Sequence, residues 1–160
     1  MSIQVGDKMP SVPLKKFGAN GPEDVDTNDY FSGRKVVLFS VPGAFTPTCS
    51  AKHLPGFVSK ADEIHAKGVD AIGCLAVNDA FVMGAWGKDQ GTDGKVDMLA
   101  DGAGKFTKAL GLELDLVDAG LGMRGQRFAL IVDDGKVTHV AIEEPGAFAV
   151  SSAEAVLDQL

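Results

Sequence analysis

A chain of 160 residues with 45% hydrophobic and 23% charged side chains is long enough to bury one core, and we expect a single domain over residues 1–160. Its formal net charge of −7 argues against a nucleic-acid backbone or an anionic membrane surface as a partner, because both would repel an acidic protein. The chain shows no secretory signal and no apolar run long enough to span a bilayer, so we expect a cytoplasmic location.

The first strong structural signal along the chain is the apolar run Val36-Val37-Leu38-Phe39, which predicts a buried central strand over residues 35–41. The chain then turns at Pro42-Gly43. A helix is expected over residues 47–67, bent near Pro55 because proline cannot donate a hydrogen bond and its ring clashes one turn back.

Cys49 lies in the first turn of this expected helix. The Thr46 hydroxyl is a candidate N-cap, and Pro47 suits the first helical position because its missing N–H would have no partner there. Free N–H groups and the helix dipole favour a charged sulfur, whereas an ordinary cysteine, with a pKa of about 8.5, is mostly protonated at neutral pH. Cys49 is therefore a candidate nucleophile, and the alternative is that it is a small buried hydrophobic residue.

The remaining elements alternate between strand and helix and then form a hairpin. An apolar run at 69–77 predicts a strand covered on both faces, and Asn78 or Asp79 could cap the helix that follows, through Lys88. Further elements are expected as a strand at 96–99, a helix at 105–110, strands at 127–132 and 136–142 around an Asp-Asp-Gly turn, and a helix from Ser151 or Ser152 to Leu160. This order predicts an α/β fold with a mixed central sheet flanked by helices. It places Cys49 beyond the carboxyl end of the first central strand, where sites in open α/β sheets gather.

Cysteine and histidine spacing bears on metal and disulfide chemistry. Cys49 and Cys74 are too few for a disulfide framework and do not form a C-x-x-C motif. Cys49 and His53 would share a helix face, so a metal site is conceivable, but no second pair of ligands is visible. We therefore expect neither a metal nor a cofactor.

One motif and four further segments carry a family resemblance. The segment Pro42-Gly43-Ala44-Phe45-Thr46-Pro47-Thr48-Cys49-Ser50 contains the pattern Pro-x-x-x-Thr-x-x-Cys. The segments that follow it in order are His53-Leu54-Pro55-Gly56-Phe57, Val77-Asn78-Asp79-Ala80-Phe81-Val82, Trp86-Gly87 and Arg127-Phe128. Over nearly its full length the chain resembles the peroxiredoxins, most closely the peroxiredoxin 5 or type II branch. The resemblance implies a thioredoxin-like fold and a thiol peroxidase that reduces hydrogen peroxide and organic hydroperoxides in redox homeostasis and oxidative-stress defence.

Peroxide reduction asks for a thiolate that attacks one oxygen while the other leaves with developing negative charge. We expect Cys49 to attack and become a sulfenic acid. The resemblance implies that Arg127 lies beside the sulfur and orients the peroxide; Arg124 is less suited because only Arg127 directly precedes Phe128. Thr46 could hydrogen-bond the thiolate or the peroxide, and Pro42 is expected to shield the sulfur from bulk water.

The loop before Cys49 is expected to contact the substrate through Gly43, Ala44, Phe45 and Thr48. Backbone N–H groups between Ala44 and Cys49 could donate to the bound peroxide as an oxyanion hole does. The Phe45 ring is expected to pack and not to react.

Two readings of Cys74 remain open. It lies on an expected buried strand, where an inert core thiol is the ordinary case. Plant type II relatives have a second cysteine at the corresponding place, so Cys74 could resolve the sulfenic acid. A disulfide bond requires its two sulfurs to be about 2 Å apart, so the helix or the strand would have to unfold locally.

The resemblance also bears on partners. Residues 146–152 lack the resolving cysteine that animal members of the branch carry there, which points to an external thiol: glutathione with glutaredoxin first, thioredoxin second. A homodimer packed near the active-site loops is implied as well. The competing readings are a redox sensor, in which Cys49 oxidises without turnover, and a thiol-disulfide oxidoreductase, which needs a neighbouring thiol to release its mixed disulfide; no C-x-x-C motif is present to supply it.

Overall fold

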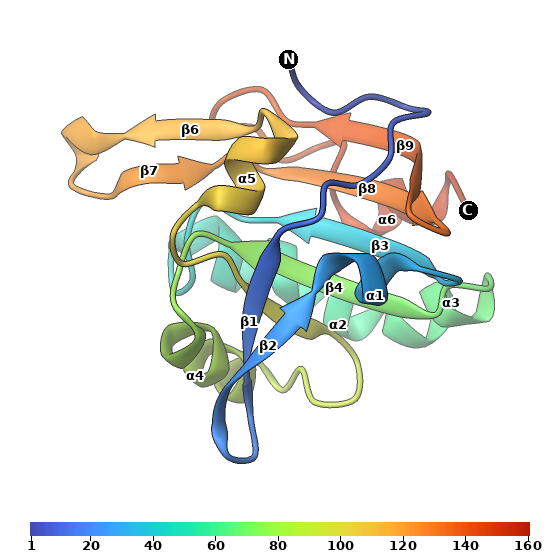
Figure 1. The fold of residues 1–160 in the computed structure, drawn as a ribbon, viewed down its shortest axis with the longest axis horizontal. Helices are drawn as coiled ribbons and strands as arrows, with labels where there is room; N and C mark the ends of the chain where they lie inside the picture. The colour runs from blue at the N-terminus through green and yellow to red at the C-terminus, as the bar shows by residue number, and fades with distance from the viewer.

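The computed structural model describes residues 1–160, and its centre is a seven-stranded sheet with strand order β2-β1-β5-β4-β3-β8-β9 (Figure 1). These strands are β1 (Pro13–Gly18), β2 (Gly21–Asp26), β3 (Lys35–Ser40), β4 (Ala71–Ala76), β5 (Asp97–Ala100), β8 (Phe128–Asp133) and β9 (Lys136–Ile142). Strands β3, β4 and β5 are parallel, whereas β8, β9, β1 and β2 join the sheet antiparallel. The expected mixed α/β architecture is confirmed.

Helices cover both faces of the sheet because its central strands are apolar on both sides. In β3, Val37 and Phe39 belong to one hydrophobic core while Val36 and Leu38 belong to another, as the alternation of side chains along a strand requires. The helical elements are α1 (Thr27–Phe31), η1 (Cys49–His53), α2 (Leu54–Ser59), α3 (Ala61–Ala66), α4 (Ala80–Gln90), α5 (Lys105–Leu110), η2 (Val117–Ala119) and α6 (Ala153–Leu157). The core that contains Phe39 also holds both cysteines. No helix combines the length and the apolar character needed to cross a membrane.

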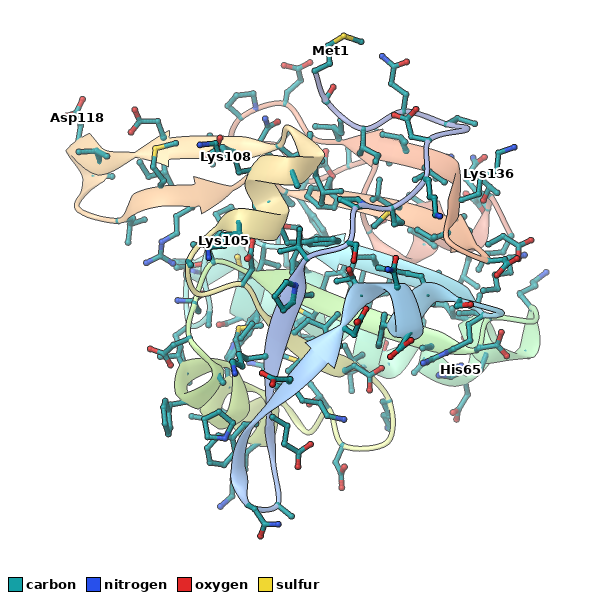
Figure 2. All side chains as sticks on the ribbon, viewed as in Figure 1. Met1, His65, Lys105, Lys108, Asp118 and Lys136 are labelled. Carbon is teal, nitrogen blue, oxygen red and sulfur yellow. The ribbon has the colours of Figure 1, made fainter.

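Of the two hairpins β8–β9 and β6–β7, the sequence predicted only the first. The β8–β9 turn has Asp134 at φ 49° and Gly135 at φ 79°, the left-handed pair that a two-residue hairpin turn needs, and it matches the prediction. The hairpin of β6 (Glu113–Leu116) and β7 (Gly122–Gly125) was not predicted, because its short strands are largely half-buried or exposed. It projects from the body of the molecule with Asp118 near its tip (Figures 1 and 2).

The helix expected over residues 47–67 is divided, and this is a correction. Residues 49–53 form a π-helical turn in which the Leu54 N–H donates to the Cys49 carbonyl, five residues back. The irregular turn thus precedes Pro55, and the break between α2 and α3 falls at Lys60.

Helix α4 supplies the hydrogen bonds that this turn lacks. A continued π pattern would give the Ser50 carbonyl a donor at residue 55, which is proline and has no N–H. Gln90 Nε2 donates to that carbonyl at 3.3 Å instead, and Trp86 Nε1 donates to Ser50 Oγ at 3.0 Å. The turn that contains Cys49 is therefore held by side chains of α4.

Candidate active site

Sheet register brings Cys49 and Arg127 together. Strand β8 pairs antiparallel with β3, with Phe128 opposite Ser40, so Arg127 falls beside the chain that leaves β3. Arg127 Nη2 donates to Cys49 Sγ at 3.1 Å, and Cys49 is wholly buried. A permanent cation in contact with a buried sulfur stabilises negative charge that reaches this point, because opposite charges are little screened there.

Only one of the groups expected to stabilise the sulfur makes a hydrogen bond to it. Arg127 is the one hydrogen-bond donor to the sulfur, and no backbone N–H of the helix start donates to it. The helix itself begins at Pro47, as expected, and it widens into the π-helical turn η1 at Cys49. Arg127 is therefore the cation that contacts Cys49, which lies in the first turn of this helix.

His53 fixes the orientation of Arg127. Its Nδ1 accepts a hydrogen bond from Arg127 Nη1 at 2.8 Å, and we assign the ring proton to Nε2, which donates to the Ser151 carbonyl at 2.9 Å. Burial, together with the Arg127 charge, lowers the pKa of His53 to about 3, so the ring is neutral at physiological pH. The sequence raised His53 only as a metal ligand; its position four residues after Cys49 was the signal that it shares the site.

The segment after β9 supports this pair and was missed as part of the site. Phe148 lies edge-on to His53 at a centroid distance of 5.0 Å, and the Arg127 guanidinium lies 5.9 Å from the same ring. Glu143 Oε2 accepts from the Ala149 N–H at 2.8 Å, the Ser151 N–H at 2.9 Å and the Ser151 hydroxyl at 2.7 Å. These bonds hold the Ser151 carbonyl in place for His53.

Burial and hydrogen bonding act in opposite directions on Glu143. Burial raises the pKa of this carboxyl, but hydrogen bonds from Ser151 and from the N–H groups of Ala149 and Val150 outweigh burial and bring the pKa below its ordinary value. Glu143 is therefore an anion that anchors the segment through hydrogen bonds to its charged form.

Thr46 stands in the loop of residues 42–46 (the catalytic loop), and its hydroxyl is already committed as a donor. Thr46 Oγ1 donates to the Gly43 carbonyl at 2.7 Å; it neither caps η1 nor hydrogen-bonds the sulfur. Because the hydroxyl hydrogen is used, Thr46 can only accept a hydrogen bond from a bound peroxide. Thr46 is therefore no donor to the thiolate or to the peroxide, and the expected helix cap by its hydroxyl is wrong.

Fewer backbone N–H groups of the loop are free to bind a peroxide than expected. The Ala44 N–H donates to Asn78 Oδ1 at 3.0 Å and is not free for a substrate. Phe45 has φ 62°, an unusual left-handed conformation for a bulky residue, and its ring is 54% exposed instead of packed in the core. Helix α4 is capped by Asp79, whose Oδ1 accepts the Val82 N–H at 2.8 Å, which leaves Asn78 to serve the loop.

A small cavity of about 250 Å³ opens beside these groups. Pro42, Thr48 and Arg127 line one part of it, and residues 143–147 line another. A larger hollow of about 730 Å³ between β1, β2 and the start of α4 contains none of the predicted catalytic residues. The smaller cavity is therefore the one placed to admit a substrate to Arg127.

Cys74 lies on β4 and is wholly buried. Burial raises the pKa of its thiol well above the ordinary value, the Cys49 charge raises it further, and Arg127 only partly opposes them. In the folded protein Cys74 is a protonated core thiol.

Comparisons with known proteins agree with this site. The Redoxin family profile matches residues 4–157. Peroxiredoxin-2E, chloroplastic, of Arabidopsis thaliana is 52% identical over 163 residues, which cover 99% of this chain and 70% of the relative. The chain is a peroxiredoxin.

Solved peroxiredoxins share its fold closely. Reduced Prx3 of Vibrio vulnificus in complex with hydrogen peroxide is 49% identical with a TM-score of 0.95, and 98% of each chain is covered. Peroxiredoxin 5 from Alvinella pompejana is 39% identical with a TM-score of 0.86, covering 97% of this chain and 96% of that one. The thioredoxin-like fold, the likeness to the peroxiredoxin 5 or type II branch and the thiol-dependent peroxidase activity are confirmed.

The expected cytoplasmic location is wrong as an inference from sequence. It rested on the absence of a secretory signal, yet the Arabidopsis peroxiredoxin that is 52% identical to this chain is named as chloroplastic. The absence of a recognisable secretory signal therefore does not establish the compartment of this protein.

We expect this peroxiredoxin to lose stability in mild acid because of His53. Its folded pKa of about 3 lies below the ordinary value of 6.5, so the unfolded chain binds the proton more readily. The contribution is complete above pH 6.5 and is lost as pH falls from there toward 3, by at most about 1.4 kcal/mol per pH unit. Urea unfolding at pH 7.5 and pH 5.0 should show a smaller difference for His53→Gln than for the unchanged protein. An equal difference in both proteins would contradict this account; His139, whose pKa is also lowered by burial, is present in both.

Proposed function

We propose that Cys49 is the peroxide-attacking thiolate and that Arg127, Thr46 and Pro42 form the rest of the catalytic set. The sulfur attacks one peroxide oxygen, the O–O bond breaks, and the other oxygen leaves with the bonding electron pair and takes a proton to become water or an alcohol. Cys49 is left as a sulfenic acid. The observation that supports this most is the 3.1 Å contact between Arg127 Nη2 and Cys49 Sγ beside the small cavity.

Arg127 can serve both ends of the reaction. One N–H contacts the sulfur and another contacts His53, which leaves further N–H groups of the guanidinium for the peroxide oxygens. As negative charge moves from sulfur to oxygen, the same fixed cation stays adjacent to it. Thr46, able only to accept, would hold the peroxide O–H.

The proposed substrates are hydrogen peroxide and organic hydroperoxides. The cavity of about 250 Å³ has room for either a peroxide alone or one carrying a compact alkyl group. Gly43, Ala44, Phe45 and Thr48 remain proposed as its surroundings, with Thr48 the member that lines it.

An external thiol is proposed as the reductant, glutathione with glutaredoxin first and thioredoxin second. Cys74 is buried and protonated, which disfavours an internal attack on the sulfenic acid. Cys49 is wholly buried too, so a bulky thiol reaches it only when the η1 turn opens locally. The following experiment tests whether Cys74 nevertheless acts as a resolving cysteine.

Treatment of the reduced protein with one equivalent of hydrogen peroxide should leave a sulfenic acid at Cys49 that a dimedone adduct reveals by mass spectrometry. A Cys49–Cys74 disulfide would instead establish internal resolution, and Cys74→Ser is the matched control. Turnover should then be faster with glutathione and glutaredoxin than with thioredoxin. Oxidation that stops at one equivalent with every donor would favour a redox sensor.

A homodimer that uses the face beside the catalytic loop is also proposed. Phe45 is 54% exposed and lies 6.4 Å from the Trp86 ring, while Phe81, on the same helix as Trp86, is 64% exposed. Met123 on β7 is 47% exposed. Large exposed apolar side chains are typical of an interface.

Phe81→Asp is expected to convert the dimer into monomers, because a charge would be buried without a partner. Sedimentation velocity over a range of concentrations measures the change. Val5→Asp, at a residue that is 63% exposed in the N-terminal segment, is the matched control. A Phe81→Asp protein that sediments as the unchanged one does would exclude this face.

A further inference from the structure

Apart from the Thr46 carbonyl, which accepts the Ser50 N–H at 2.9 Å, the hydrogen bonds to the backbone of the catalytic loop come from side chains. The Pro42 carbonyl accepts from Arg124 Nη1 at 3.2 Å, and the Ala44 N–H donates to Asn78 Oδ1 at 3.0 Å. Between them, the Gly43 carbonyl accepts from the Thr46 hydroxyl at 2.7 Å. Two of these three contacts come from outside the loop, one from each side.

Arg124 is itself fixed before it reaches the loop. Its Nε donates to the Leu121 carbonyl at 2.8 Å, which ties the guanidinium to the β6–β7 hairpin. The group then lies so close to Gly43 that a Cβ at that position would stand 2.9 Å from Nη1. Gly43 therefore allows a close approach, and Arg124 is the polar link between the projecting hairpin and the loop.

Asn78 holds the opposite side. It lies two residues after the end of β4 and precedes Asp79, which caps α4. An amide oxygen accepts the Ala44 N–H without adding a charge near the thiolate. The side chain thus joins the end of β4 to the loop that follows β3.

The loop needs such restraints because its conformation is not the intrinsic preference of its sequence. Phe45, with φ 62°, is held in a region that costs a bulky residue on the order of 1–3 kcal/mol unless its surroundings impose it. Phe45 is bracketed by Ala44, whose N–H is held by Asn78, and Thr46, whose hydroxyl is held by the Gly43 carbonyl.

We propose that Arg124 and Asn78 are positioning residues that hold the catalytic loop from two sides, so that Pro42 lines the cavity beside Arg127 and Thr46 is held in place to accept a hydrogen bond from the peroxide. The inference rests on the proposed roles of Cys49 and Thr46. It separates two properties of the site: ionisation of the sulfur depends on Arg127, whereas capture of peroxide depends on the loop as well.

The test compares Arg124→Met, Asn78→Leu and their combination in the full chain. The second-order rate constant for oxidation of Cys49 by hydrogen peroxide, from quenched-flow samples analysed by mass spectrometry, should fall about tenfold to a hundredfold in each single variant. The pH titration of thiolate absorbance should stay as in the unchanged protein. The double variant should lose less than the product of the single losses, because both residues act on one loop.

Arg34→Met is the matched control, since Arg34 stacks on Tyr30 at the opposite end of β3. Arg124→Lys keeps the charge but cannot donate to the Leu121 and Pro42 carbonyls at once, so its rate constant should be intermediate. This variant serves as the test if Arg124→Met does not fold. A wild-type rate in folded Arg124 and Asn78 variants would overturn the proposal, as would a thiolate titration that shifts in step with the rate. Failure of the proposed function would show differently, as peroxide consumption that persists in Cys49→Ser.

Discussion

Replacing Cys49 with serine is expected to abolish peroxide consumption. A serine hydroxyl beside Arg127 stays protonated at neutral pH and cannot supply the electron pair that breaks the O–O bond. Peroxide loss should be followed with glutathione and glutaredoxin in excess. The fold should be unchanged, because the substitution replaces one small buried side chain with another of similar shape.

Cys74→Ser separates this effect from the general loss of a buried thiol. Both cysteines lie in the same hydrophobic core, but only Cys49 contacts Arg127. The Cys74 variant should still oxidise at Cys49 at the rate of the unchanged protein. Turnover retained in Cys49→Ser would disprove the assignment of the nucleophile.

Arg127→Met is expected to slow the peroxide step by about a hundredfold to a thousandfold, the effect of removing one preorganised donor from a developing oxyanion. The same change should move the thiolate titration to higher pH, because the cation 3.1 Å from the sulfur is gone. Stopped-flow kinetics and thiolate absorbance measure the two effects on one preparation.

Arg127→Lys is the informative companion. An ammonium is a point charge and cannot contact Cys49 Sγ and His53 Nδ1 at once in the geometry of the guanidinium. It should recover much of the thiolate but little of the rate. If methionine at this position left both quantities unchanged, Arg127 would have no catalytic role.

The parts of this protein that local sequence determines were predictable. The apolar runs that became β3 and β4 and the turn at Asp134-Gly135 follow from patterns a few residues long. The Thr46-to-Cys49 spacing and Arg127 were found through the family motif.

The supporting contacts could not be read in the same way. Arg124 reaches Pro42 across 82 positions of sequence, and His53 reaches Ser151 across 98. Such pairs depend on sheet register and on how segments pack after folding, which no local periodicity reports. The π-helical turn was not predicted for a related reason. Pro55 indicated an irregular helix, but the donors that stabilise the turn, Trp86 and Gln90, lie on another helix.

The contact between Trp86 and Ser50 has a practical consequence. The chain contains one tryptophan, and its indole N–H donates to the residue that follows Cys49. Any event that displaces this turn, whether formation of the sulfenic acid or attack by the reducing thiol, changes the surroundings of the only indole chromophore. The unlabelled protein therefore carries its own optical reporter, and its ultraviolet emission should resolve oxidation and recycling as separate kinetic phases.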